Sequence, residues 1–365
     1  MVRFLARCQT DGSHLQALNY MGEPLTPRGT LKALLRGETP QRPLLMPIIF
    51  SLGSRLENLP LREFQSNPTK IANALRQIRA VLKVDGVACY FDPFLEAEAL
   101  GCRVEWLPDG SQRVTPPPYT DVDELLQKLK TPDSICEKGR GRAGCEVLQR
   151  LKAMLRDEPA LMVRVTGPLT LAAQLLSPGD LDTPASVPSS LIECAAEVTA
   201  CVAKEFVAAG ADAIFLTEDF LPDLPDENYQ HWAALLEPVI NLVRFYDCLP
   251  VLLLEDPARV GAVLPGLLQG HGCLVGRLGT PERKPEAGDW RATASLRGLA
   301  LPNNLFAERA DDGCMSAACA AIRGLRPMLL TTTADIPMTA DLKQVATALK
   351  SLREACAEPE QGLRR

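Results

Sequence analysis

The stretch "SLIECAAEVTACVAKEFVAAGADAIFLTED", residues 190–219, contains one complete helix and strand unit. Apolar and small residues recur with the period of a helix as far as Gly210, and glycine commonly follows the last turn of a helix. The next residues form an apolar run of strand length, which ends in Glu218 and Asp219. A strand that is apolar on both faces and follows a helix indicates a parallel sheet covered by helices.

Seven other apolar runs of this kind are spaced along the chain. The eight runs, in order, are RPLLMPIIF (42–50), DGVACYFD (85–92), ALMVRVTGP (160–168), ADAIFLTED (211–219), LPVLLLED (249–256), CLVGRLGT (273–280), SLRGLAL (295–301) and PMLLTTTAD (327–335). Helical segments separate them, and Asn67-Pro68 and Thr339 are typical of helix starts. Eight such strands predict an α/β fold, a closed (β/α)8 TIM barrel. An open doubly wound sheet lacks support, because the sequence has no dinucleotide glycine fingerprint and no P-loop.

One segment interrupts the alternation of helices and strands. Residues 102–118, "CRVEWLPDGSQRVTPPP", place a Pro-Asp-Gly turn between two alternating stretches. This pattern predicts a β-hairpin inserted after the second barrel strand. We expect one barrel domain over residues 26–357, an N-terminal extension over 1–25 and a C-terminal tail over 358–365.

Composition limits the kind of partner. The chain has 365 residues, a net charge of -6 and no long basic block, which argues against nucleic acid or an anionic membrane surface. No apolar run approaches the roughly 20 residues that a membrane-spanning helix requires, and the first residues lack a signal-peptide pattern. We therefore expect a cytoplasmic protein with a small-molecule substrate. The twelve cysteines are better explained as reduced, buried thiols than as a disulfide framework.

In a barrel of this kind the active site lies at the carboxyl ends of the strands. The residues at these ends are rich in acids and include no histidine; they are Ser51, Asp92, Gly167, Glu218, Asp219, Glu255, Asp256, Thr280, Asn303 and Asp335. Such an acidic mouth suits a cationic substrate, for example a methylated amine, or a divalent metal better than an anionic substrate. Asp256 precedes a proline and is better explained as a helix cap.

Three local patterns refine this set. Asp92 ends an apolar strand and is followed by Pro93, so we expect its carboxylate to point into the site. Glu96 and Glu98 are two residues apart and cannot share one helical face, so at most one points inward. Adjacent residues on a strand point opposite ways, so only one of the acids at 218 and 219 faces inward.

Five segments resemble the uroporphyrinogen decarboxylase superfamily, in order along the chain from about Thr26 to Ala357. They are "LTPRGTLKALLRGETPQRPLLMP", "FDPFLEAEALGCRVEW", "VRVTGPLTLAAQLL", "FVAAGADAIFLTED" and "LLTTTADIPMTADLKQV". The resemblance implies a barrel and one of two chemistries, either decarboxylation of uroporphyrinogen or zinc-dependent methyl transfer between a corrinoid and a thiol such as coenzyme M. The segment "EAEALG" is more similar to the methyltransferase branch.

The resemblance also shows where this chain departs from both chemistries. Asp92 matches the aspartate with which the decarboxylases hold pyrrole N–H groups. Of their arginine pair only Arg55 remains, with Ser51 in the other place, and their late histidine falls on Ala334. The zinc ligands of the methyltransferases, His-x-Cys and a later Cys, fall on Leu253, Glu255 and again the alanine. No metal site is therefore predicted, and zinc lacks its usual ligands.

Three functions remain open at this point. The first is a divergent methyltransferase of a corrinoid- or folate-linked system, with a corrinoid or tetrahydrofolate as methyl donor or acceptor and a corrinoid protein as partner. Its catalytic candidates are Asp92, Arg55, Glu218, Asp219 and Glu255, and its substrate-binding candidates are Ser51, Glu96, Gly167, Asn303 and Asp335. The second is a decarboxylase that uses Asp92 and Arg55. The third is a non-catalytic ligand-binding barrel. The family's frequent dimers make a homodimer a further expectation.

Overall fold

The computed structural model describes most of the chain. The described residues are 25–107, 112–129, 134, 137, 139–156, 158–176, 187–221, 226–254, 263, 273–277, 298–306, 312–325 and 327–357. The expected N-terminal extension, apart from Leu25, and the expected C-terminal tail lie outside these ranges.

Eight strands form one sheet, in which the paired strands run parallel. The strands are β1 (Leu44–Leu45), β2 (Gly86–Tyr90), β5 (Ala160–Thr166), β6 (Ala213–Glu218), β7 (Leu249–Leu254), β8 (Cys273–Arg277), β9 (Gly298–Leu301) and β10 (Leu329–Thr332). Their order is β1-β10-β9-β8-β7-β6-β5-β2. From β2 to β10 each strand of the sheet lies beside the next one along the chain, and β1 lies beside the last strand, β10. All eight predicted strands are confirmed.

The two ends of this order meet around Asp85, the residue before β2. Its backbone N–H donates to the carbonyl oxygen of Leu45 over 2.9 Å, and its carboxylate accepts from the Leu45 N–H over 2.8 Å. A Cβ added at Gly86 would lie 2.7 Å from side-chain atoms of Met46, so the segments that contain these two residues are in close contact. The two ends of the sheet are therefore in contact at Asp85 and Leu45, without a strand ladder between β1 and β2, and the fold is the predicted (β/α)8 barrel.

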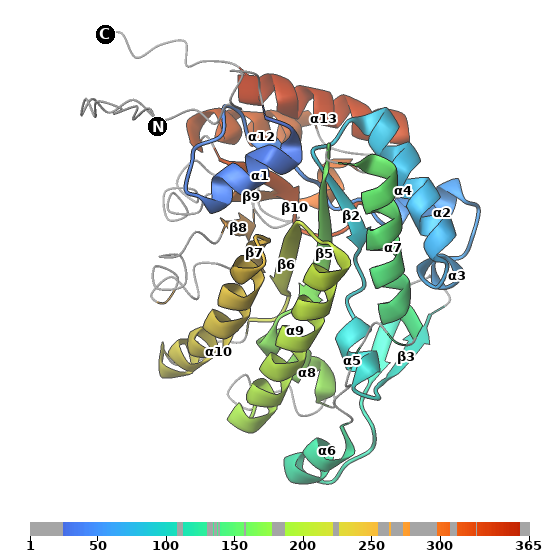
Figure 1. Ribbon diagram of the computed structural model, residues 1–365, viewed down its shortest axis with the longest axis vertical. Helices are drawn as coiled ribbons and strands as arrows, with labels where there is room; N and C mark the ends of the chain where they lie inside the picture. The colour runs from blue at the N-terminus through green and yellow to red at the C-terminus, as the bar shows by residue number, and fades with distance from the viewer. Residues whose placement is uncertain are drawn as a thin grey trace, which may run out of the picture.

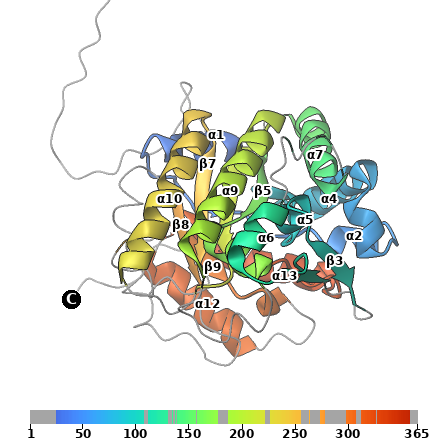
Figure 2. The same ribbon diagram turned by 90° about the horizontal axis from the view of Figure 1, so that it is seen from below.

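Helices cover the outside of the barrel (Figures 1 and 2). They are α1 (Pro27–Leu35), α2 (Leu52–Leu56), α3 (Leu61–Gln65), α4 (Pro68–Leu82), α5 (Leu95–Ala99), α6 (Val122–Lys128), α7 (Gly139–Leu155), α8 (Pro168–Leu175), α9 (Ser189–Ala209), α10 (Asp226–Phe245), the 3-10 helix η4 (Asn303–Phe306), α12 (Asp312–Leu325) and α13 (Leu342–Ala357). Their apolar faces pack on strands such as β2 and β6, which are buried along their whole length. No described helix is long and apolar enough to cross a membrane.

Two of the predicted helix ends are confirmed and one is wrong. The Asn67 side chain caps α4 by accepting from the Lys70 N–H over 3.1 Å, and Gly210 ends α9 with a φ of 109°. Helix α13 begins at Leu342 rather than near Thr339. The backbone carbonyls of Thr339 and Ala340 accept hydrogen bonds from Arg55 instead, so the chain remains a loop there.

The predicted hairpin is also confirmed. Strands β3 (Arg103–Trp106) and β4 (Gln112–Thr115) pair antiparallel, separate from the barrel sheet. An ion pair between Arg113 and Glu105, 2.7 Å long, joins the two strands on an exposed face. The hairpin follows α5 and brings Gln112 to the carboxyl end of the barrel, where it lines a cavity.

Candidate active site

A cavity of about 390 Å³ lies at the carboxyl ends of the barrel strands. Its described lining comes from the segments that follow β1, β2, β6 and β10, from the C-terminal parts of β5, β6 and β7, from α3 and from the hairpin. Much of this lining is apolar, and it includes Ile48, Phe50, Leu61, Phe91, Leu253 and Ala334. This is the end of the barrel at which the sequence predicted the site.

The carboxylate of Asp335 ties together the two loops that follow β1 and β10. Its two oxygens accept from the backbone N–H groups of Phe50 and Ser51, over 2.8 and 2.7 Å. The Asn303 amide donates to the backbone carbonyl of the same aspartate over 2.9 Å. Burial raises the pKa of Asp335 to about 6, and the accepted hydrogen bonds only partly oppose this rise. The three predicted residues are thus brought together, and Ser51 and Asp335 line the cavity.

On another side of the cavity, Arg164 and Asp219 form an ion pair. The Arg164 Nη2 lies 2.5 Å from the Asp219 Oδ2, and both residues line the cavity. The arginine side chain is 13% exposed and the aspartate side chain 49%, so the carboxylate faces solvent while the guanidinium is held in the wall. The sequence predicted Asp219 but missed Arg164. A signal existed, because this arginine is the one charged residue of the run "ALMVRVTGP".

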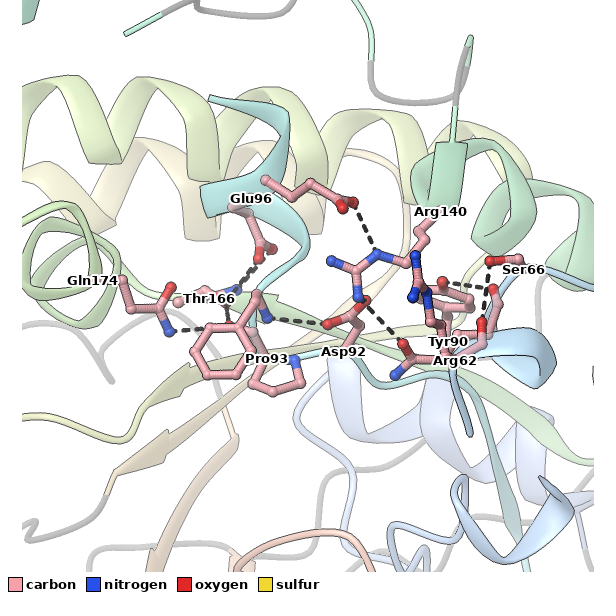
Figure 3. A network of polar contacts seen from close by, with 12 residues as sticks. Arg62, Ser66, Tyr90, Asp92, Pro93, Glu96, Arg140, Thr166 and Gln174 are labelled. Atoms are coloured by element: carbon pink, nitrogen blue, oxygen red, sulfur yellow. Dashed lines mark hydrogen bonds and ion pairs between the residues drawn. The ribbon is translucent and has the colours of Figure 1, made fainter. Parts of the chain in front are cut away.

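The predicted catalytic residue Asp92 does not line the cavity in the described structure. Its side chain has no exposed area, and its carboxylate lies 2.5 Å from the Arg140 Nη1 (Figure 3). It also accepts from the Phe94 N–H over 3.1 Å. Burial raises the pKa of Asp92 above its ordinary value, although the nearby guanidinium lowers it. Contrary to the sequence expectation, the carboxylate points at Arg140 rather than into the described cavity.

Arg140 comes from α7 and joins several elements behind the cavity wall (Figure 3). Besides Asp92, it contacts Glu98 through Nε over 2.8 Å and the Gln65 Oε1 through Nη1 over 3.2 Å. Gln65 lines the cavity, so this network supports the wall from outside. The sequence missed this residue, and no local pattern marks it.

Glu96 and Glu98 face different ways, as predicted. Glu96 is fully buried and accepts from the N–H and the hydroxyl of Thr166, over 2.9 and 2.7 Å. Burial raises the pKa of Glu96. The Glu98 side chain is 45% exposed and pairs with Arg140. Glu96 points inward but fixes the end of β5, and neither residue is among the described lining of the cavity.

Glu218 caps the N-terminus of α8. It accepts from the N–H groups of Leu169 and Thr170, over 3.1 and 2.8 Å, and from the Trp232 Nε1 over 2.8 Å. Burial raises the pKa of Glu218 to about 7. A Cβ added at Gly167 would lie 2.3 Å from the Glu218 Cδ, so the glycine makes room for this carboxylate. Glu218 and Asp219 thus point apart, as predicted, and Asp219 is the one that faces the cavity.

The other predicted residues either do not line the cavity or lie outside the described residues. Arg55 is exposed and donates to the carbonyls of Thr339 and Ala340, both over 3.1 Å. It is not among the described lining residues. Glu255, Asp256 and Thr280 lie outside the described residues.

Two positions that the resemblance assigns to zinc ligands lie in the cavity wall. They are Leu253 and Ala334, whose hydrocarbon side chains have no atom that can bind a metal. Among the residues that the structure describes, no group of three His, Cys, Asp or Glu could hold a metal ion. The described wall therefore does not fit a His-x-Cys and Cys zinc site.

A parallel (β/α)8 barrel with a partly apolar cavity at its carboxyl face defines a class of small-molecule-binding proteins. Within that class, the family model for uroporphyrinogen decarboxylase (URO-D) matches residues 26–241, more than half of the chain. The chain belongs to this family.

Three proteins to which this chain is similar are methyl-transfer enzymes by name. A methylated-thiol--coenzyme M methyltransferase of Methanosarcina mazei is 24% identical over 207 residues, which are 54% of this chain and 55% of that protein. The solved structure of a methyltransferase from Methanosarcina mazei aligns with a TM-score of 0.67 at 16% identity, over 90% of this chain and 99% of that one. A B12-independent methionine synthase from Shewanella sp. W3-18-1 aligns with a TM-score of 0.53 at 13% identity, over 80% and 88%. At these identities the structural matches establish the fold.

Proposed function

We propose that this protein is a URO-D-superfamily methyltransferase that moves a methyl group between a small substrate and a corrinoid or folate. The observation that carries the proposal is the cavity, whose wall is largely hydrocarbon where Phe50, Phe91 and Leu253 lie and polar at the Arg164–Asp219 pair and Asp335. An apolar wall accommodates a methyl group, and a few polar groups fix its orientation. The similarity to a methylated-thiol--coenzyme M methyltransferase also supports methyl transfer as the function.

Decarboxylation of uroporphyrinogen is less well supported by this geometry. It would need the Asp92 carboxylate to hold pyrrole N–H groups, but that carboxylate is buried against Arg140. It would also need cations for a substrate with many carboxylates. Arg164 is the one Lys or Arg among the described lining residues, and it is already paired with Asp219.

The corrinoid or folate, when bound, supplies the atom that gains or gives up the methyl group. The residues of this chain then have two tasks. The apolar wall holds the methyl-bearing end of the substrate and excludes water from it. When a methyl group leaves a thioether sulfur or an ether oxygen, that atom keeps the bonding electron pair and becomes a thiolate or an alkoxide, which a proton neutralises. Asp335 lines the cavity and has a pKa of about 6, so it can give up and take a proton near neutral pH.

The test is a methyl-transfer assay with purified protein. Reduced cobalamin and tetrahydrofolate are each offered with methylated thiols, amines and carboxylic acids, and methylcobalamin or methyltetrahydrofolate is measured. We expect transfer to one of the two acceptors. We also expect the Asp92→Asn variant to retain transfer if it folds, because this carboxylate does not reach the cavity. Absence of transfer to either acceptor, together with decarboxylation of uroporphyrinogen, would overturn the proposal.

A non-catalytic ligand-binding barrel is the second candidate. It is favoured by Leu253 and Ala334, which put hydrocarbon where the resemblance expects metal ligands. The same assay separates the two proposals, because a binding barrel would take up methylated ligands without forming any methylated acceptor. A corrinoid protein as partner and a homodimer remain expectations that the assay with isolated cobalamin does not require.

A further inference from the structure

The polar side of the cavity contains hydrogen-bonding groups that the described residues leave unsatisfied. Thr217 is 1% exposed, and its hydroxyl has no hydrogen-bond partner in the described structure. The Arg164 Nε and the Gln112 Nε2 are buried atoms that also lack one. All three residues line the same cavity. A buried polar group without a partner costs free energy, so such groups are expected to meet a ligand or water.

The strand register places two of these groups on one face of the barrel wall. Strands β5 and β6 pair with Arg164 opposite Phe215 and Thr166 opposite Thr217. Side chains two residues apart on a strand share a face, so Arg164 and Thr217 both point into the barrel from neighbouring strands. Gln112 reaches the cavity from the hairpin on another side. All three groups are N–H or O–H donors, and donors without acceptors favour a ligand rich in oxygen acceptors.

The charges around the cavity also differ from the acidic mouth that the sequence suggested. The carboxylates of Asp92, Glu96 and Glu218 are buried against Arg140, Thr166 and the N-terminus of α8. Two carboxylates remain in the described lining. One belongs to Asp335 and accepts two backbone N–H groups, and the other belongs to Asp219 and is paired with Arg164. The described wall therefore offers a guanidinium with a free Nε rather than a set of free acids.

We propose that Arg164, with Thr217 and Gln112, binds a carboxylate of the substrate, which makes the substrate a small methylated carboxylic acid. That the substrate carries a methyl group rests on the proposed methyl-transfer function. The carboxylate site itself does not depend on that function. A guanidinium binds a carboxylate through charge-assisted hydrogen bonds, and the Nε of Arg164, unlike the Nη2 held by Asp219, has no partner among the described residues and can donate to a substrate carboxylate. The apolar wall around Phe91 and Leu253 would then receive the methyl-bearing end.

Binding of three probes of equal length tests the site without any turnover. Butanoate, butanamide and butylammonium carry an anionic, a neutral and a cationic group at the end of the same four-carbon skeleton. Titration calorimetry with the full-length protein should give roughly tenfold tighter binding for butanoate than for butanamide, the effect of one charge-assisted hydrogen bond. Butylammonium should bind most weakly. Equal binding of all three, strongest binding of butylammonium, or no binding of butanoate would each overturn the carboxylate site.

Two variants of the ion pair should change butanoate affinity in opposite directions. Arg164→Gln removes the guanidinium and should abolish the preference for butanoate over butanamide. Asp219→Asn removes the competing carboxylate and should strengthen butanoate binding. If the pair only held β5 to the loop after β6, both variants would weaken binding or stability alike, and that result would also overturn the inference. Arg142→Gln removes an arginine from the exposed pair with Glu146 and serves as the control that changes nothing.

The outcomes separate this inference from the proposed function. Methyl transfer without preference for butanoate would leave the methyltransferase proposal standing and reject the carboxylate site. A preference for butanoate that Arg164→Gln removes, without methyl transfer to cobalamin or tetrahydrofolate, would keep the carboxylate site and reject the methyltransferase.

Discussion

The Arg140 guanidinium lies 2.5 Å from the Asp92 carboxylate, and the two side chains are 9% and 0% exposed (Figure 3). The pair links α7 to the residue that follows strand β2. Removing one partner leaves the other charge buried, which typically costs about 3–5 kcal/mol. We therefore expect Arg140→Met and Asp92→Asn each to lower the free energy of unfolding by several kcal/mol, measured by urea denaturation.

The control for this prediction is an exposed pair of the same kind. Arg142→Met breaks the contact with Glu146, in which the two side chains are 64% and 32% exposed. Such surface pairs contribute about 0–1 kcal/mol. The double variant of Asp92 and Arg140 should lose less than the sum of the single losses. Additive losses would mean that the two buried charges do not stabilise each other.

Gly167→Ala should destabilise the carboxyl end of the barrel. The new Cβ would lie 2.3 Å from the Glu218 Cδ, and the contact cannot be relieved without moving that carboxylate away from the N-terminus of α8. We expect a loss of about 1–3 kcal/mol. Gly324→Ala on α12 is the matched control, because nothing lies within 4 Å of its added Cβ. That variant should keep or raise the melting temperature.

Glu218 makes stability depend on pH with a definite sign. Its pKa rises from the ordinary value of 4.5 to about 7 on folding, so the folded protein holds a proton that the unfolded chain releases between these values. Stability from this residue is therefore full below pH 4.5 and is lost as the pH rises through 7, by a few kcal/mol at most. The free energy of unfolding of Glu218→Gln should fall less steeply over this range. A variant with the same slope as the natural protein would show that folding does not raise the pKa of this carboxyl.

Asp335 should give the methyl-transfer rate its pH dependence. If it supplies the proton to the demethylated atom, it must be protonated, and kcat should decline as the pH rises through about 6. Asp335→Asn should lower kcat by a factor of about 100 and remove that decline. Since this carboxylate also holds the loop at Phe50 and Ser51, the pH profile is the decisive measurement, because a purely structural role would lower the rate without changing the profile.

Metal analysis tests the role assigned to the cavity wall. Leu253 and Ala334 replace the expected ligands with hydrocarbon, so purified protein should keep substoichiometric zinc after dialysis, measured by plasma mass spectrometry. Methyl transfer should also survive treatment with a chelator. One zinc per chain, lost together with activity on chelation, would mean that residues outside the described wall bind the metal.

The sequence predicted the barrel because its strands are buried on both faces and are therefore written as continuous apolar runs, such as "LPVLLLED". It predicted Ser51, Asp219 and Asp335 at the site because the ends of parallel strands meet at one face of a barrel. The contact of Asp92 with Arg140 joins residues that lie far apart in the sequence, and no local pattern encodes such a contact. Arg164 was missed because it lies within a strand rather than at its end.

The closure of the barrel at Asp85 has a consequence for solubility. Strand β1 is two residues long. Beside it, the Asp85 carboxylate accepts hydrogen bonds from the Leu45 N–H and from two nitrogens of Arg42, over 2.6 to 2.8 Å. Without that carboxylate, the ring would lose a main contact between its first two strands. Two strand edges with unpaired backbone groups would then be accessible to other chains, and exposed edges of this kind are the sites at which β-proteins aggregate.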